Sequence, residues 1–335
     1  MTSNVSKRRI GVRVALGLVS LALSIGIAEF VASLLYQPPL EIPDAHKFVP
    51  FARTGRFTPA INELGFRQSP VGSDASAPDV LRILCLGDSF TFGDGIERGE
   101  DRFTDLIEAR LNADASQHAA GRKFHVYNAG VSGSRPTNWV QYMSRILPTY
   151  RPDAVFAVFF LRDGTELCTS LRCFTTTIED LKARYARKFG YRFSCLARIF
   201  YARLIMRDFS EDYRKKVVNS YLGSNRQRAT WVKQQVALRD IRDRCRALGV
   251  ELQLIVFPLL FDLDRYPYES VEQEIARFAR EADIPCFSLL EGFRGHNARS
   301  LWVAPHDQHP NEKGHRIAAD TLYPYLRRAI GLTPN

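Results

Sequence analysis

The most constraining feature of the chain is an apolar run that stops abruptly at the turn Gly87-Asp88-Ser89. The preceding residues, 82–86, have the length and composition of a buried parallel strand, and Phe90-Thr91-Phe92 continues the turn as the start of a helix. A strand, a tight turn and a helix in succession are typical of an α/β sheet, in which ligands bind at the carboxyl ends of the strands. The sequence therefore predicts that Ser89 is exposed at a strand end, in the position of a nucleophile.

Apolar runs and helical stretches alternate along the rest of the chain. Further strands are predicted near residues 124–128, 154–160, 251–257 and 284–288. This alternation predicts a three-layer α/β/α sandwich around a parallel sheet of about five strands. About ninety residues, roughly 162–248, separate the third strand from the fourth, whereas a single crossover needs only a few tens. We expect a helical insert there that contributes to substrate specificity.

The N-terminus has the pattern of a membrane anchor. A basic tail, residues 1–13, precedes an apolar segment, residues 14–36, that is long enough to cross about 30 Å of hydrocarbon as a helix. A cleaved signal peptide is the alternative, but no clear small-x-small cleavage site precedes Gln37. Because clustered positive charge resists translocation, we expect a single-pass inner-membrane protein with a cytoplasmic N-terminus and a periplasmic or extracellular domain.

Composition limits the remaining organisation and the partners. Residues 37–77 are rich in Pro, Ser and Gly and predict a linker, and residues 78–335 hold the folded domain. The net charge of +10 is spread over many short stretches without a nucleic-acid-binding motif, so we expect no nucleic-acid partner. Attraction to an anionic lipid or polymer surface stays open.

The six cysteines fall into two groups. Cys168 and Cys173 flank a short polar loop, and in an oxidising compartment either a disulfide between them or one from either of them to Cys195 is open. No histidine or second cysteine pair accompanies them at zinc spacing, so we expect no metal site. The others lie in predicted strands or a predicted helix and are expected to be buried: Cys85, Cys245 and Cys286.

The C-terminal segment supplies the base that a nucleophilic serine requires. A serine hydroxyl attacks well only when a base takes its proton and a carboxylate orients that base. Asp307-Gln308-His309 provides both, in an expected loop that leads into the last helix. We therefore predict Ser89 as the nucleophile, His309 as the general base and then acid, and Asp307 as the orienting carboxylate. Competing histidines lack this local arrangement or fall within a predicted helix: His296, His306 and His315.

The tetrahedral intermediate formed on an attacked carbonyl also needs hydrogen-bond donors for its oxyanion. Backbone N–H groups at the Ser89 turn, at the positive end of the following helix, are one source. The second predicted strand ends in Asn128-Ala129-Gly130, where glycine permits a close approach, so the Gly130 N–H is the predicted second donor. An ordinary strand-to-loop turn is the alternative explanation of Gly130.

Together these blocks resemble the SGNH (GDSL-like) hydrolase superfamily, in its membrane-anchored bacterial form. Gly87-Asp88-Ser89 matches the first block of the superfamily, Asn128-Ala129-Gly130 the second and Asp307-Gln308-His309 the last, in the expected order. Residues Asn62 to Arg67 resemble a stretch that often precedes the domain in anchored members. The resemblance implies a flavodoxin-like fold, a serine esterase or acyl-transfer mechanism, and no metal or organic cofactor.

One block departs from the pattern of the superfamily. The third block normally carries an asparagine whose side chain donates to the oxyanion, and this chain has Arg162 in its place. Three roles are open for Arg162. It is an oxyanion donor fixed by Asp163 or Glu166, a binding group for an anionic part of the substrate, or a structural ion pair in a domain without activity.

These observations lead to a first functional hypothesis and two alternatives. The leading prediction is a serine esterase outside the cytoplasm that acts on an acylated cell-envelope glycan, with the membrane contacted through the N-terminal helix. The alternatives are an O-acyltransferase and a non-catalytic glycan-binding or assembly module on the same fold. Hydrolysis and transfer differ only in whether water or a hydroxyl of the glycan accepts the acyl group, and the sequence does not separate them.

Overall fold

The computed structural model describes residues 2–35, 61–62, 65–67, 77, 79–117, 122–148, 150–167, 180, 183–304 and 307–332. Contacts divide the chain into two compact units. The N-terminal unit comprises Met1–Phe48 and Cys168–Tyr213, and the sheet unit comprises Val49–Leu167 and Arg214–Asn335. The predicted linker, residues 37–77, lies largely outside the described residues. Its limits, and those of the predicted domain and insert, stay predictions.

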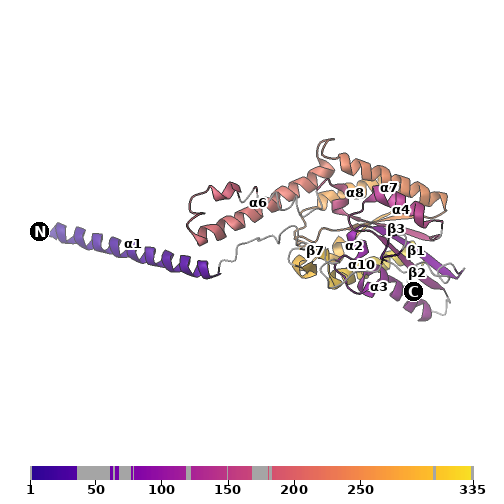
Figure 1. The fold of residues 1–335 in the computed structure, drawn as a ribbon, viewed down its shortest axis with the longest axis horizontal. Coiled ribbons are helices and arrows are strands. Elements are labelled where there is room, and N and C mark those ends of the chain that lie inside the picture. Colours follow the sequence, from indigo (N-terminus) through magenta and orange to yellow (C-terminus); the bar gives the residue numbers. More distant parts are fainter. Residues whose placement is uncertain are drawn as a thin grey trace. The chain divides into compact units, whose positions relative to one another are not determined.

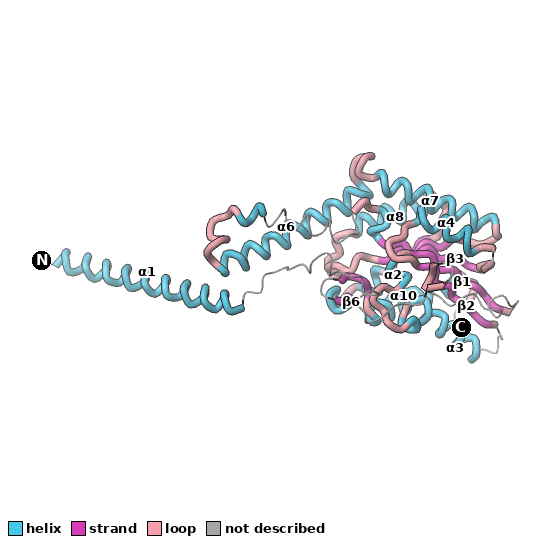
Figure 2. Tube along the Cα trace, in the orientation of Figure 1, coloured by secondary structure: helices cyan, strands magenta, loops and turns pink. Residues whose placement is uncertain are grey.

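The sheet unit is built on five parallel strands in the order β2-β1-β3-β4-β5 (Figures 1 and 2). The strands are β1 (Val80–Gly87), β2 (Lys123–Gly130), β3 (Ala154–Phe160), β4 (Leu252–Phe257) and β5 (Cys286–Ser288). This is the strand order of a flavodoxin-like fold, and it confirms the predicted sheet. The order reverses between β1 and β3, and in such sheets ligands bind at the carboxyl ends of the strands at that point.

The register of the sheet brings the candidate residues to one edge. β3 is buried at every position, as an uninterrupted apolar run predicts for a strand covered on both faces. Gly87 at the end of β1 lies opposite Gly130 of β2 and Val158 of β3. The carboxyl ends of these strands therefore meet, and each is followed or ended by a residue that the sequence singled out.

Helices cover both faces of the sheet (Figure 1). On one face α3 (Phe103–Gln117) packs with α10 (Glu312–Ala329), and on the other α4 (Pro136–Ile146) packs with α7 (Ala229–Ala247), beside α8 (Glu269–Glu281). The short helices are α2 (Ser89–Phe92), α9 (Leu290–Phe293), η3 (Gly99–Asp101), η4 (Leu161–Gly164) and η5 (Ala298–Leu301). This arrangement confirms the three-layer sandwich.

Trp231 fixes α7 to the sheet unit. Its side chain is fully buried, with its ring centroid 5.0 Å from that of Tyr221 and 5.2 Å from that of Phe278 on α8. The Tyr221 hydroxyl donates to the Leu161 carbonyl at 2.5 Å, directly beyond β3. The chain between β3 and β4 thus returns to the sheet through a buried aromatic cluster, whose rings add about 0.5–1.5 kcal/mol per pair beyond the burial of their area.

The structure differs from the sequence prediction just before the last helix. The segment expected as a loop forms β7 (Asp307–Pro310), which pairs antiparallel with β6 (Trp302–Ala304). A strand this short takes its stability from its partner and carries almost no pattern of its own, so sequence reasoning misses it. Alternate residues of a strand point to the same face, and β7 therefore places the side chains of Asp307 and His309 together.

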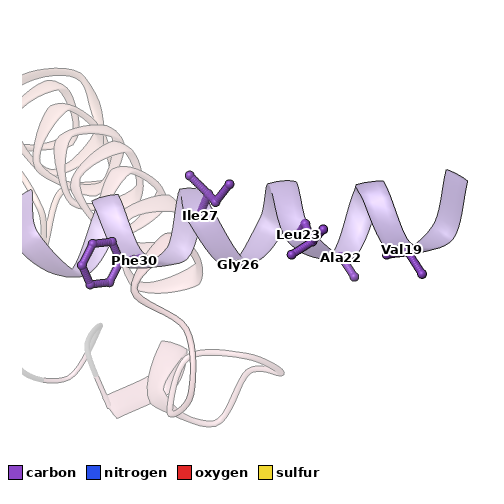
Figure 3. A pocket seen from close by; sticks show the side chains of 6 residues that line it. All are labelled: Val19, Ala22, Leu23, Gly26, Ile27 and Phe30. Carbon is purple, nitrogen blue, oxygen red and sulfur yellow. The ribbon is translucent and has the colours of Figure 1, made fainter. Parts of the chain in front are cut away.

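The N-terminal unit contains α1 (Thr2–Leu35) and the first part of α6 (Cys195–Leu222), a helix that contributes residues to both units. Within the described residues, Gly11–Leu34 is the one segment long and apolar enough to cross a membrane, with a mean hydropathy of 2.2. A shallow hollow on α1 has only apolar side chains of α1 and a glycine around it (Figure 3): Val19, Ala22, Leu23, Gly26, Ile27 and Phe30. It offers no group for catalysis.

The cysteines follow the predictions only in part. Cys85 and Cys245 are buried, and burial raises the pKa of both thiols to about 12. Cys286 is only half-buried because it lies on β5, an edge strand. Cys195 is a free thiol in the structure. Cys168 and Cys173 lie outside the described residues, so a disulfide between them stays a prediction.

Candidate active site

A turn held by its own side chains connects β1 to Ser89, the first residue of α2. The Asp88 side chain caps this helix by accepting a hydrogen bond from Phe90 N at 2.9 Å. A side chain at Gly87 would meet Thr91 Oγ1 at 2.0 Å, so glycine is required below the turn. Ser89 is only 8 % exposed, less than the sequence predicts, because the imidazole of His309 lies over its hydroxyl.

Ser89, His309 and Asp307 form a continuous hydrogen-bond chain. The His309 Nε2 atom is 2.9 Å from Ser89 Oγ, and the His309 Nδ1 atom is 2.5 Å from Asp307 Oδ1. The same carboxylate oxygen accepts the His309 backbone N–H at 3.1 Å. The three side chains predicted as nucleophile, base and orienting carboxylate thus stand in the relation that activates a serine.

The charges around His309 favour its protonated form. Burial alone would lower the pKa of the imidazole, but the hydrogen bond to Asp307 and the negative charges of Asp307, Asp94 and Asp88 outweigh it, and the pKa is raised above 6.5. Burial alone would raise the pKa of the Asp307 carboxyl. The hydrogen bond from His309, its charge and the charge of Arg162 outweigh burial, and the pKa of Asp307 is lowered. An imidazolium that forms during proton transfer is therefore stabilised in place.

The end of β2 lies so close to α2 that only glycine fits. A Cβ atom at Gly130 would lie 2.2 Å from Phe92 N. The Gly130 N–H donates to Asn128 Oδ1 at 3.0 Å, and Asn128 Nδ2 donates to the Thr91 carbonyl at 2.6 Å and to Thr104 Oγ1 at 2.9 Å. The N–H predicted as an oxyanion donor is thus already hydrogen-bonded, and its role toward substrate stays a prediction.

Arg162 lies in η4, directly after β3, with its guanidinium 5.8 Å from the centroid of the Phe160 ring. The carboxylates that were predicted to fix it have other partners: Asp163 accepts Phe160 N at 3.1 Å, and Glu166 accepts Thr230 Oγ1 at 2.9 Å. Neither carboxylate forms an ion pair with Arg162, and the three roles named for Arg162 stay predictions. Within the part of the chain that the structure describes, the guanidinium forms no salt bridge.

The positive charge of Arg162 still acts on the site. Burial raises the pKa of Asp88 to about 6, and the charges of His309 and Arg162 oppose that rise. Burial also raises the pKa of Asp163 well above 3.8, with Arg162 again acting in the opposite sense. A guanidinium that forms no salt bridge to any described residue, at the carboxyl edge of a sheet, is available to an anionic ligand or a developing oxyanion.

A second carboxylate faces His309, and sequence reasoning missed it. Asp94 Oδ2 lies 3.8 Å from His309 Nε2, while Asp94 Oδ1 accepts Ser132 Oγ at 2.8 Å. Burial raises the pKa of Asp94, and the charge of His309 opposes this rise. The signal in the sequence is Gly93, whose left-handed conformation (φ 80°) turns the chain so that Asp94 N donates to the Ser89 carbonyl at 3.0 Å.

Two of the three competing histidines are described in the structure, and neither contacts Ser89. His315 is fully buried in α10, where its Nδ1 accepts Phe103 N at 3.2 Å, and burial lowers its pKa to about 3. His296 is half-buried in the turn after α9, and its backbone N–H donates to the Phe293 carbonyl. His306 lies outside the described residues.

The segment from Asn62 to Arg67, which the resemblance places before the domain, packs against the chain that follows α2. Phe66 is fully buried, and the buried guanidinium of Arg67 donates to the carbonyls of Gly93 and Glu97, both at 2.9 Å. Sequence reasoning assigned this segment to a linker and gave Arg67 no role. Among the described residues no group of His, Cys, Asp and Glu is arranged to hold a metal, and the lack of a cofactor stays a prediction.

Comparison with protein-family profiles identifies one family. The sequence profile of the GDSL-like Lipase/Acylhydrolase family matches residues 85–317, more than half of the chain. Comparison with curated protein sequences gives no match.

Solved structures with a similar trace are distant in sequence. A crystal structure of TesA is 15 % identical, with 74 % of this chain and 99 % of that chain covered and a TM-score of 0.44. A catalytic mutant of Axe2, an acetylxylan esterase from Geobacillus stearothermophilus, is 16 % identical, with 76 % and 95 % covered and a TM-score of 0.41. A two-domain esterase active on acetylated mannans is 17 % identical, with 78 % and 52 % covered and a TM-score of 0.41. The assignment therefore rests on the profile and the parallel sheet, and the chain belongs to the GDSL-like lipase/acylhydrolase family of SGNH serine hydrolases, which act on ester bonds.

Proposed function

We propose that this enzyme hydrolyses an acyl ester on a cell-envelope glycan outside the cytoplasm, with Ser89 as nucleophile, His309 as general base and Asp307 as its orienting carboxylate. The observation that carries the catalytic part is the hydrogen-bond chain from Ser89 Oγ through His309 to Asp307. As Oγ attacks the ester carbonyl its proton moves to His309 Nε2, and Asp307 stabilises the imidazolium. His309 then protonates the leaving alcohol, and water repeats the sequence to release the acid.

The oxyanion has three candidate donors. The Ser89 N–H lies in the first turn of α2, where backbone N–H groups have no partner inside the helix. The Gly130 N–H takes part by exchanging its bond to Asn128 for one to the oxyanion. Arg162 supplies a full positive charge at the same edge of the sheet and replaces the amide that the superfamily normally uses there.

The proposed location rests on the N-terminal segment. Gly11–Leu34, at about 1.5 Å per residue, extends over roughly 36 Å and so exceeds the hydrocarbon thickness of a bilayer. A basic tail precedes it, which favours a cytoplasmic N-terminus and an external enzyme. Retained anchoring places the active site in the compartment that contains envelope glycans. Intact mass of the membrane-extracted protein tests this part: loss of about the first 36 residues would mean cleavage rather than anchoring.

The catalytic assignment is tested by labelling the full-length chain with a serine-directed fluorophosphonate. We expect one label on the peptide that contains Ser89, no label on the Ser89→Ala variant, and labelling of Ser132→Ala, which removes a neighbouring hydroxyl. Ser89→Ala should also abolish hydrolysis of p-nitrophenyl acetate without loss of the folded state in circular dichroism. Labelling of Ser89→Ala at the wild-type rate would refute the assignment.

Acyl transfer is the second candidate for the same site, because Arg162 is free to hold an acceptor or an anionic part of the substrate. Incubation of an acetylated glycan with an unacetylated one separates the two reactions. Free acetate with no newly acetylated glycan supports hydrolysis, and acetylation of the acceptor supports transfer.

A further inference from the structure

The N-terminal unit carries a basic and aromatic segment that the proposed reaction does not use. We call residues 183–207 the tip. Between these limits the sequence has seven Arg or Lys residues and no Asp or Glu. All but one of these basic residues are exposed: Arg184, Arg187, Lys188, Arg192, Arg203 and Arg207. The tip therefore presents a dense positive charge that no acidic residue within it offsets.

The tip also exposes large aromatic side chains around the turn that leads into α6. Phe189 is 96 % exposed and Phe193 is 84 % exposed, and Phe200, within α6, is 58 % exposed. Apolar side chains gathered in one exposed place mark a contact surface rather than a solvated one. Cationic and aromatic residues side by side are the composition of segments that lie in a membrane interface.

The turn that carries these phenylalanines is held in place. The Tyr201 hydroxyl of α6 donates to the Phe189 carbonyl at 3.2 Å, and the Tyr185 hydroxyl donates to Asp208 Oδ2 at 2.6 Å. The Tyr201 ring lies 5.6 Å from that of Tyr185 and 6.0 Å from that of Tyr191. The tyrosines thus hold the backbone of the turn on α6, and the exposure of Phe189 and Phe193 follows from an ordered conformation.

Glu29 joins the tip to α1. It is the only charged residue in the apolar segment 14–36, and its carboxylate accepts hydrogen bonds from Ser194 Oγ at 2.8 Å, from Leu196 N at 3.3 Å and from Cys195 N. These donors lie at the first turn of α6, so the positive end of that helix satisfies the one charge of the anchor. Glu29 precedes the end of the apolar span at Leu34 by five residues, about 7.5 Å along the helix axis.

We propose that the tip is a membrane-interface element: Phe189 and Phe193 enter the acyl boundary of the bilayer that α1 spans, and the basic side chains bind anionic phospholipid headgroups. The proposal rests on the membrane anchor of the proposed function. Glu29 fixes the start of α6 near one end of the span, which is the level of the headgroups. A soluble anionic polymer would account for the charge but not for the exposed phenylalanines, and an aqueous partner would not require the link to α1.

The experiment uses the full-length chain in vesicles and reads tryptophan quenching by lipids brominated near the headgroup and, for the anchor, by lipids brominated deep in the acyl chain. Phe193→Trp reports on the tip, Leu23→Trp on the anchor, and Val236→Trp, an exposed position on α7, is the control in the sheet unit. With phosphatidylcholine and phosphatidylglycerol we expect about twofold more quenching at position 193 than at position 236, relative to the parent protein. Hydrolysis of p-nitrophenyl acetate at the parent rate verifies that each variant is folded.

The outcomes separate the tip from the anchor. Quenching at position 23 without quenching at position 193 refutes the proposal that the tip enters the membrane interface, and supports the membrane anchor. Quenching at 193 with none at 23, even by lipids brominated deep in the chain, supports the tip and refutes the spanning helix. Protection of the tryptophan at 193 by a soluble sulfated polysaccharide, with no quenching by vesicles, assigns the surface to a polymer and overturns the proposal.

A charge variant tests the lipid class. Changing Arg184, Arg187, Lys188 and Arg192 to Gln should reduce quenching at position 193 about twofold in vesicles that contain phosphatidylglycerol and leave it unchanged in pure phosphatidylcholine. The matched control removes the same charge from exposed positions of the sheet unit: Arg226, Lys233, Arg265 and Arg280 to Gln. Equal loss in both variants, or no loss in either, would contradict headgroup binding by the tip.

Discussion

The carboxyl ends of β1 and β3 lie side by side in one sheet, but they hold their functional side chains in opposite ways. At the end of β1, the Ser89 hydroxyl is hydrogen-bonded to His309, and Asp88 caps the helix α2 that begins at Ser89. At the end of β3, the guanidinium of Arg162 forms no salt bridge to any described residue, and its predicted partners are engaged elsewhere. The side chains at the end of β1 are fixed before substrate binds, whereas the guanidinium at the end of β3 can change its conformation when substrate binds.

This difference suits the ends of β1 and β3 to different roles. A nucleophile and its base gain rate from fixed geometry, because their alignment costs nothing when the substrate binds. A long cationic side chain without a partner recognises charge wherever it develops, at the cost of ordering that side chain during the reaction. Variants on the β1 side should therefore lower the rate steeply, and variants at β3 should act more weakly and depend on the substrate.

The largest effect is expected from Asp307→Asn. The amide keeps the size of the side chain but removes the charge that orients His309 and stabilises its protonated form, so kcat on p-nitrophenyl acetate should fall by about 10³-fold. Stopped-flow or steady-state kinetics measure this loss, and Asp243→Asn, an exposed position on α7, is the control. A loss below about tenfold would mean that His309 needs no carboxylate and that the fixed geometry around Ser89 contributes little to the rate.

Gly130→Ala should come next. The new methyl group would lie 2.2 Å from Phe92 N, which belongs to a backbone and cannot move aside without shifting α2. We expect a stability loss of about 1–3 kcal/mol and a fall of about 10²-fold in kcat/KM, because Ser89 moves with the helix. Gly99→Ala, where the nearest atom is 3.7 Å away, should leave both quantities unchanged. Wild-type melting temperature in Gly130→Ala would contradict the tight contact.

Arg162→Gln should have a smaller effect that depends on the substrate. We expect kcat/KM for a neutral aryl ester to fall by about tenfold, with most of the loss in kcat, and Arg162→Lys to recover part of it by restoring the charge. If instead KM rises for an anionic substrate only, Arg162 binds substrate and does not serve the oxyanion. An unchanged rate on neutral and anionic esters alike would remove Arg162 from the site.

The smallest effect is a shift of the pH profile in Asp94→Asn. Neutral imidazole is the active form of the base, so activity rises as the pH increases through the His309 pKa, which lies above 6.5. Asp94 is one of the carboxylates that raise this pKa. Its removal should therefore move the midpoint of the acid limb of kcat/KM to lower pH by a fraction of a unit. A midpoint that stays or moves upward would show that Asp94 does not raise the pKa of His309.

The parts that sequence reasoning predicted are those with a local signature. The uninterrupted apolar run of β3 indicates a strand buried on both faces wherever it is placed, and Gly87 with Asp88 specifies a tight turn. The pairing of Ser89 with Asp307 and His309 followed from chemical need, since a serine requires a base and that base an acid. The structure places these three residues together.

The parts that were missed depend on contacts between distant segments. β7 exists because β6 lies beside it, and Asp94 faces His309 because the C-terminal strand returns to the turn after β1. Pairing of Arg162 with Asp163 or Glu166 was one of the roles left open by the sequence, and in the structure the backbone of Phe160 and Thr230 bind these two carboxylates.

The sequence by itself determined the order of the strands along the chain, the apolar N-terminal span, and the residue types able to activate a serine. Only the tertiary structure decided that Gly130 packs against the backbone of α2, that Asn128 occupies its N–H, and that Arg162 has no fixed partner among the described residues. The physical reason is the distance along the chain over which each interaction acts. Apolar patterns and turn residues act over a few neighbouring positions, whereas the competition for each buried donor and acceptor is settled by whichever segment the fold brings nearest.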